Sequence, residues 1–176
     1  SRGLGDVYKR QVQRLEDIQE ITYLLGKYFN NLDIHNWEAV AETFDIDVHT
    51  EYCDGFMVYE GREDAVGFLE SCMLPEQIST HLGHCFQIDI IDATHAKAKV
   101  YLEDHLINFL GHTNQHGTAL YDDEFIKRDG KWYISKIGYE RIYEEQYARN
   151  EYNSGHIGNV QYLKKAGYDV DEMQKR

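Results

Sequence analysis

The chain has 176 residues, and a single domain of that length can bury roughly two-thirds of the surface that its unfolded form exposes. Its 31 Asp and Glu residues against 18 Lys and Arg residues give a formal net charge of -13, which disfavours binding to nucleic acid or to an anionic membrane. A hydrophobic content of 42% and a single proline are typical of a folded globule rather than a disordered chain.

The first eleven residues lie outside the amphipathic pattern that follows, and they do not begin with Met. Residues 6–11, with the sequence DVYKRQ, resemble the in-frame translation of a transposon adapter used in sequencing. We therefore interpret residues 1–11 as a non-native or disordered leader of a gene fragment whose true start is missing, with an ordinary flexible N-terminus as the alternative. Residues 12–149 are expected to form the domain, and residues 150–176 a C-terminal tail.

Apolar side chains recur at helical spacing over residues 15–32. Gaps of three and four separate Ile18, Ile21, Leu25, Tyr28 and Leu32. This period predicts a first helix with Tyr28 facing inward. Asn36 is a good N-cap for a second, short helix, which is expected to end at about Phe44. A third helix is expected to open at Gly61 and to close before Pro75.

The remaining segments read as strands separated by turns. Short strands are expected at residues 48–52 and 56–59, and long ones at 82–91, 97–109, 118–128 and 132–143. The Asp-Gly pair at residues 129–130 favours a hairpin between the last two. Three helices followed by long antiparallel strands predict an α+β fold, in which a curved sheet wraps around the N-terminal helices.

The cysteines and the hydropathy pattern bear on the location of the protein. Cys53, Cys72 and Cys85 are widely spaced, which argues against a disulfide framework or a structural zinc site. No apolar run approaches the roughly 18 residues of a membrane span, and no secretory signal is recognisable. The sequence therefore predicts a reducing, cytoplasmic setting.

A carboxylate lies among aliphatic residues in the strand expected at residues 97–109. Alternation places Asp104 on the same face as Leu102 and Leu106. In such surroundings the carboxyl group must be either protonated or hydrogen-bonded to a donor such as a histidine or tyrosine. A structural hydrogen bond or a slip of strand register is the alternative. His81 stands at the start of the preceding strand, and an imidazole held by Asp104 would act as an acid and base near neutral pH.

Other polar residues allow a functional and a structural interpretation. His81 and His84 lie three residues apart, but no third ligand follows at a recognisable spacing, so we predict no metal and interpret His84 as a core histidine. The hydroxyls of Tyr28 and Tyr52 suit an oxygen that gains negative charge, with packing as the alternative. Arg141 either binds an anionic substrate group or pairs with neighbouring glutamates.

The chain has no glycine-rich nucleotide loop and no nucleophile elbow, which leaves proton transfer without a cofactor. Four blocks then occur in a characteristic order. They are Gly26-Lys27-Tyr28-Phe29, Ile78-Ser79-Thr80-His81-Leu82-Gly83-His84, Tyr101-Leu102-Glu103-Asp104 and Gly138-Tyr139-Glu140-Arg141-Ile142-Tyr143-Glu144-Glu145. Together they resemble the bile acid 7α-dehydratases, of the SnoaL-like branch of the NTF2-like superfamily. The resemblance runs from about Leu15 to Arg149 and implies an α+β cone.

The resemblance implies roles for six residues. It places Tyr28, His81 and Asp104 on catalytic positions, and Asp33, Tyr52 and Arg141 on positions that bind substrate or support the site. The implied protein is a cofactor-free carbon–oxygen lyase that removes water from a hydroxylated 3-oxo-Δ4 steroid, such as a 7α-hydroxy bile acid, free or as a coenzyme A thioester. His81 would move the proton, Asp104 would orient the imidazole, and Tyr28 would hydrogen-bond a substrate oxygen.

The stretch at residues 109–117 looks shorter than the corresponding loop of those enzymes, and the tail looks longer. The chemistry is therefore better supported than the substrate. A non-catalytic NTF2-like ligand-binding module, or a polyketide cyclase or isomerase, remains the alternative. A homo-oligomer, either dimer or trimer, is expected by analogy with the fold.

Overall fold

The computed structural model describes residues 2–150, 152, 154–158 and 160–175. Its helices and strands, in chain order, are α1 (Arg2–Asp33), α2 (Trp37–Ala41), β1 (Phe44–Tyr52), β2 (Met57–Glu60), α3 (Arg62–Cys72), β3 (Gln77–Ile90), β4 (His95–Asn108), β5 (Thr113–Arg128), β6 (Lys131–Ala148), α4 (Gln161–Lys165) and α5 (Val170–Met173).

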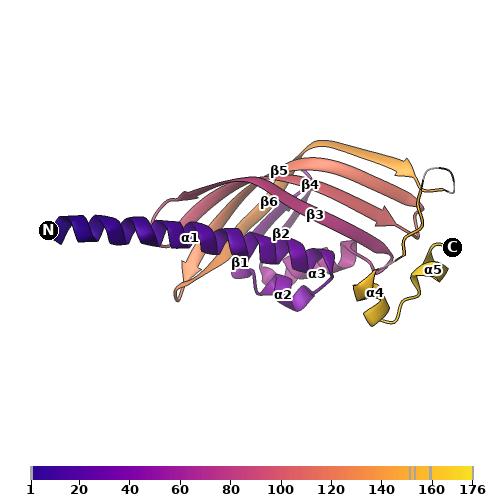
Figure 1. Cartoon of the computed structure of the whole chain (residues 1–176), viewed down its shortest axis with the longest axis horizontal. Coiled ribbons are helices and arrows are strands. Elements are labelled where there is room, and N and C mark those ends of the chain that lie inside the picture. The colour runs from indigo at the N-terminus through magenta and orange to yellow at the C-terminus, as the bar shows by residue number, and fades with distance from the viewer. Residues whose placement is uncertain (1, 151, 153, 159, 176) are drawn as a thin grey trace.

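Within the described residues, six strands form one sheet in the order β2-β1-β6-β5-β4-β3. Neighbouring strands are antiparallel, except that β1 and β6 run parallel. The long strands curve, with α1 beside β3 and with α3 beside β1 (Figure 1). This arrangement confirms the predicted α+β fold, with a curved sheet around the N-terminal helices.

The predicted inner face of α1 forms part of the main core. Ile21, Leu25 and Tyr28 are fully buried, and they pack in the same cluster as the inward side chains of the long strands. Burial of each such side chain contributes roughly 1.5–3 kcal/mol. The core therefore fixes which face of α1 looks into the sheet, and it places Tyr28 inside the cone.

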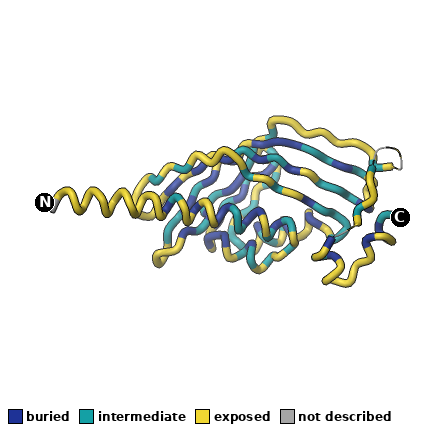
Figure 2. The backbone as a smooth tube through the Cα atoms, in the orientation of Figure 1, coloured by how far each residue is buried: buried dark blue, intermediate teal, exposed yellow. Residues whose placement is uncertain are grey.

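The first part of α1 projects beyond the sheet. Residues 3–16 are exposed, and they form the extended end of the helix in Figure 2. The helix thus begins at Arg2 rather than near Leu15, and it runs through most of the segment that we interpreted as a leader. Residues 2–14 contain no proline, so no residue there removes a helical hydrogen bond, although Gly3 and Gly5 are unfavourable in a helix.

A bulge in β3 reverses the side-chain alternation of that strand. Cys85 adopts a positive φ of 51°, and the pairing with β4 shifts between His84 and Gln87. His84 therefore faces outward, whereas Ile88 and Ile90 pack against the core. The prediction of a core histidine at His84 is wrong, because its side chain is 46% exposed.

The C-terminal tail carries a second, smaller core. Its buried members are Phe109, Val160, Leu163, Val170 and Met173. The hydroxyl of Tyr162, at 3.2 Å, donates to the backbone carbonyl of Gln77 at the start of β3. No described helix combines the length and the apolar character that crossing a membrane requires.

Candidate active site

A cavity of about 290 Å³ lies between the helices and the inner face of the sheet. Apolar side chains from α1, α3 and β4 make up much of its wall, among them Leu32, Phe68, Leu69, Leu102 and Leu106. The polar side chains that reach it include the predicted Tyr28, Tyr52, His81, Asp104 and Arg141. The structure thus brings these five predicted residues to one cavity, and Asp33 contacts His81 at its wall.

His81 is held by the carboxylate at the end of α1. Its Nδ1 lies 2.6 Å from Oδ1 of Asp33, and its backbone N–H donates to Oδ2 at 2.9 Å. Ser79, two residues earlier on the same face of β3, donates its hydroxyl to Oδ1 at 2.7 Å. An ionised carboxylate only accepts hydrogen bonds, so Nδ1 of His81 carries the proton and Nε2 has a lone pair available.

The ionised state of Asp33 follows from its surroundings. Burial by itself raises the pKa of this carboxyl, but the hydrogen bonds from His81 and Ser79 outweigh that effect and lower the pKa below its ordinary value. Asp33 therefore stays charged at neutral pH. The charge stabilises the imidazolium that forms when His81 takes a proton.

Asp104 does not contact the imidazole of His81, contrary to the expectation that it orients this ring. The two residues face each other in the β3–β4 register, yet the carboxylate of Asp104 pairs with Arg141, whose Nη1 lies 2.7 Å from Oδ2. Asp33 reaches His81 instead, because α1 ends beside β3. Asp104 is only 1% exposed, so the buried carboxylate that the sequence indicated has a guanidinium as its partner.

Gly117 on β5 makes room for this ion pair. It lies opposite Asp104 on β4, and a Cβ added there would stand 2.7 Å from Nη1 of Arg141 and 3.1 Å from Oδ1 of Asp104. Arg141 also lies 3.4 Å, through Nε, from Glu144 on β6. Burial alone would lower the pKa of Arg141. The neighbouring carboxylates of Asp104 and Glu144 outweigh that effect, so the pKa is raised and the guanidinium stays charged.

The tyrosines of the cavity are kept protonated. The hydroxyls of Tyr28 and Tyr52 lie 3.4 Å apart, and both residues are buried. Burial raises the pKa of Tyr28 and of Tyr52 above the ordinary value, since a phenolate would lose its hydration. Tyr28 is therefore a neutral hydrogen-bond donor at any pH at which the protein would work.

Sequence reasoning missed several residues of the site. Ser79 supports Asp33, Tyr121 lines the cavity, and the ring of Tyr139 lies 5.0 Å from the guanidinium carbon of Arg141. Alternation along β3 offered a signal for Ser79, because it shares a face with His81. Tyr121 and Tyr139 read as ordinary packing residues, since aromatic side chains are common in strand cores.

The buried carboxyl of Asp123, on β5, lies outside the ion-pair network of Asp104 and Arg141. Neither of its oxygens makes a hydrogen bond of good geometry with the described residues, although the backbone N–H of Gly138 and the charge of Lys136 favour its ionised form. Burial dominates and raises the pKa of Asp123 well above the ordinary value. An acid of this kind takes up a proton on folding, so the folded state loses stability as the pH rises above about 4.

We therefore expect Asp123→Asn to raise the free energy of unfolding at pH 8 by about 1–3 kcal/mol relative to the wild type. The difference should shrink toward pH 4, where the unfolded chain also holds the proton. Urea unfolding at several pH values measures this effect, and Asp89→Asn on the exposed face of β3 is the matched control. An equal difference at pH 4 and pH 8 would contradict the assignment.

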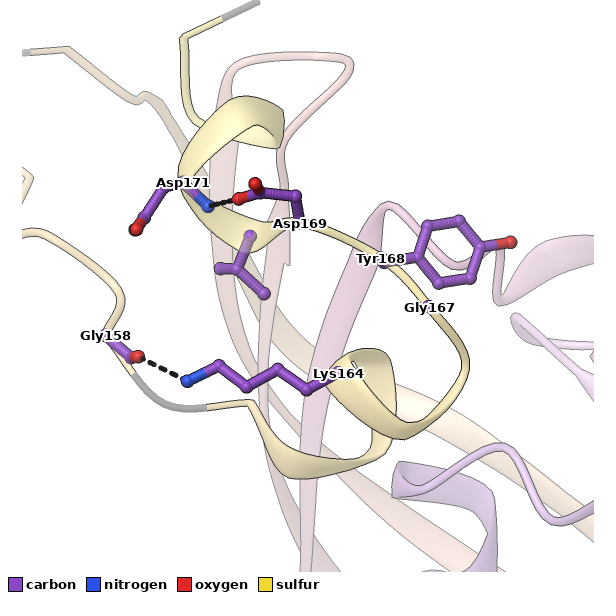
Figure 3. Close-up of a pocket in the computed structure, with 7 residues that line it drawn as sticks. Gly158, Lys164, Gly167, Tyr168, Asp169 and Asp171 are labelled. Atoms are coloured by element: carbon purple, nitrogen blue, oxygen red, sulfur yellow. Dashed lines mark hydrogen bonds between the residues drawn. The ribbon is translucent and has the colours of Figure 1, made fainter.

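Another hollow lies in the C-terminal tail, around α4 and α5 (Figure 3). Its polar groups serve local structure. Lys164 donates to the backbone carbonyl of Gly158 at 3.3 Å, and the carboxylate of Asp169 caps α5 by accepting from the backbone N–H of Asp171 (Figure 3). None of the six predicted site residues lines this hollow, so we place the candidate chemistry in the cone cavity.

An α+β cone that encloses an Asp–His pair, a buried ion pair and neutral tyrosines defines a small-molecule domain with acid–base groups inside. The family comparison agrees with this class. The model of the SnoaL-like domain matches residues 13–137, and the chain belongs to that family.

Solved structures share the fold. A protein provisionally named scytalone dehydratase, from Novosphingobium aromaticivorans, superimposes with a TM-score of 0.72 at 19% identity, over 82% of this chain and 99% of that one. A hexachlorocyclohexane dehydrochlorinase, LinA type 2, gives a TM-score of 0.74 at 20% identity, over 84% and 99%. LinA type 3 from Novosphingobium barchaimii gives 0.72 at 20% identity, over 78% and 94%. At these identities the likeness concerns the fold.

Proposed function

We propose that this protein is a cofactor-independent dehydratase, a carbon–oxygen lyase that acts on a hydroxylated polycyclic enone. The observation that carries the proposal is the 2.6 Å contact between His81 and Asp33 at the wall of a largely apolar cavity. This contact leaves Nε2 of His81 as a base, and no other strong base is required for an elimination. The names of the structural neighbours, a dehydratase and a dehydrochlorinase, denote eliminations and support the same class of reaction.

In the proposed reaction, Nε2 of His81 takes a proton from the carbon next to the one that bears the hydroxyl. The electron pair of the broken C–H bond forms the new double bond as the C–O bond breaks. The imidazolium then returns its proton to the departing oxygen, which leaves as water. Asp33 stabilises the imidazolium in between, because the carboxylate stays ionised and accepts the Nδ1 hydrogen.

The remaining polar groups are suited to oxygen atoms of the substrate. Tyr28, as a neutral phenol, donates a hydrogen bond to an oxygen where negative charge develops. Arg141 is charged and partly committed to Asp104, so it binds a carbonyl or carboxylate oxygen at one end of the cavity. In this scheme Asp104 positions Arg141, and Tyr52 positions the Tyr28 hydroxyl.

The cavity also bears on the substrate. Its volume of about 290 Å³ lies near the lower end of the roughly 300–1,000 Å³ of small-molecule sites. We therefore infer that the cavity encloses the reacting rings of a ligand and that the remainder extends through the mouth. A 7α-hydroxy-3-oxo-Δ4 bile acid, free or as a coenzyme A thioester, has this shape, and its conjugated ketone makes the departing proton acidic.

The test is mass spectrometry of 7α-hydroxy-3-oxo-Δ4 bile acids, free and as coenzyme A thioesters, after incubation with the protein. The wild type is expected to remove one molecule of water. His81→Ala is expected to slow the reaction by about 10²- to 10⁴-fold, the usual contribution of a general acid–base group. His156→Ala, in the exposed tail, is the control and should match the wild type. Failure of the wild type on all these compounds would remove the bile acid assignment, and full activity of His81→Ala would remove the mechanism.

A further inference from the structure

Three potential metal ligands gather on the outer face of the sheet, away from the cavity. Glu103 and His105 lie two residues apart on β4, and His116 is the direct partner of His105 on β5. Asp104, which lies between the two β4 residues, points inward to the cavity wall. The cluster therefore belongs to a different surface from the candidate active site.

The distances within the cluster are short. Nε2 of His105 lies 3.3 Å from Oε1 of Glu103, and Nε2 of His116 lies 3.5 Å from the same oxygen. The rings of the two histidines stack, with centroids 4.2 Å apart and 12° between their planes. One potential ligand atom from each residue lies within 4.8 Å of the other two.

These separations suit a metal ion with tetrahedral coordination. Zinc binds histidine nitrogen and carboxylate oxygen at about 2.0–2.2 Å, so its ligand atoms lie about 3.3–3.6 Å from one another. Both contacts to Glu103 fall in or next to this range. Rotation of the two imidazoles out of their parallel arrangement would bring the three ligand atoms around one point, and the fourth position would be open to water.

A buried ring nitrogen of His116, without a hydrogen-bond partner in the part of the chain that the structure describes, supports a ligand role. Its Nε2 atom is shielded from solvent, and it makes no hydrogen bond of good geometry with the described residues. A buried ring nitrogen without a partner costs free energy unless something binds it. A carboxylate oxygen can accept from two N–H donors, but the 3.5 Å contact from His116 lacks hydrogen-bond geometry, whereas one cation would bind all three atoms.

We propose that Glu103, His105 and His116 form a binding site for a divalent transition-metal ion of the zinc type. Two imidazoles and one carboxylate favour zinc and its first-row neighbours over magnesium or calcium, which prefer oxygen ligands alone. The formal charge of -13 favours cations in general, whereas the two nitrogen ligands supply the selectivity. Bound metal ties β4 to β5 on the outer face of the sheet.

The test is calorimetric titration of the untagged full chain with zinc chloride, together with the visible absorption of the cobalt-loaded protein. We expect one zinc ion per chain and the intense cobalt bands of a tetrahedral site. His105→Ala and His116→Ala should each weaken zinc binding by at least about 100-fold, since even outer-shell changes typically cost about 10- to 100-fold. Glu103→Gln, which keeps the side-chain shape, should also weaken it.

The matched control is His95→Ala, which removes another exposed histidine of β4 that also contacts a carboxylate. It should bind zinc as the wild type does. Circular dichroism establishes that each variant is folded before titration. Absence of zinc binding by the wild type, or equal affinity of the wild type and the two histidine variants, would overturn the proposal.

Discussion

Asp33→Asn is expected to slow the proposed dehydration by about 10²- to 10⁴-fold while the protein stays folded. The amide has the shape of the carboxylate, but it carries no charge to stabilise the imidazolium. It can also donate a hydrogen bond to Nδ1 of His81, which would move the ring proton to Nε2 and block the base. The loss should therefore appear mainly in kcat rather than in KM.

Two measurements examine this prediction. Steady-state rates give the loss of activity, and ¹⁵N NMR of histidine-labelled protein shows which ring nitrogen of His81 carries the proton. Asp92→Asn is a matched control, because Asp92 contacts His95 at 3.1 Å in the exposed turn between β3 and β4, and neither residue lines the cavity. A wild-type rate in Asp33→Asn, with the proton still on Nδ1, would show that another group orients His81.

Gly138→Ala is expected to reduce the free energy of unfolding by about 3 kcal/mol or more, at the upper end of the usual cost of overpacking. Gly138 lies on β6 opposite Glu51 of the parallel strand β1, and an added Cβ would collide with the backbone carbonyl of Glu51. Backbone atoms cannot rotate away as a side chain can. The clash would therefore separate the only parallel pair among the described strands.

Urea unfolding measures this effect. Because the neighbouring Tyr139 lines the cavity, a change in catalytic rate is a second measurement. Gly67→Ala in α3 is the control, because nothing stands within 4 Å of a Cβ at Gly67. That substitution should stabilise the protein by about 0.5–1 kcal/mol, since glycine is unfavourable inside a helix. A loss smaller than about 1 kcal/mol for Gly138→Ala would show that β1 and β6 can separate at little cost.

The sequence predicted the type of each element in the domain better than its ends. Period-3.6 and period-2 patterns identify helices and strands wherever apolar residues alternate regularly. The first part of β3 was missed, because residues 77–81 contain mostly polar side chains. The start of β5 was missed for the same reason, as residues 113–117 carry no aliphatic side chain.

The site was predicted by residue type more successfully than by contact. The resemblance and the strand pattern indicated His81, Asp33 and Asp104, but which carboxylate holds the imidazole depends on where α1 ends beside β3. That position is set by tertiary packing, and no local pattern in the sequence indicates it. The same limit applies to the Glu103, His105 and His116 cluster, because its spacing along the chain becomes a cluster only through the β4–β5 register.

The second core in the tail divides the chain into two cooperative units of unequal strength. The buried side chains around Leu163 and Val170 are few compared with those of the main core, so local opening of the tail costs less free energy than opening of the sheet. Tyr162 connects the two units, since its hydroxyl donates to the backbone carbonyl of Gln77 and its ring lies 5.0 Å from the ring of His35. Transient release of the tail would remove the Tyr162 hydrogen bond at Gln77, two residues before Ser79 on β3, without unfolding the cone. Motion of the tail is thereby linked to the strand end that supports the Asp33–His81 pair.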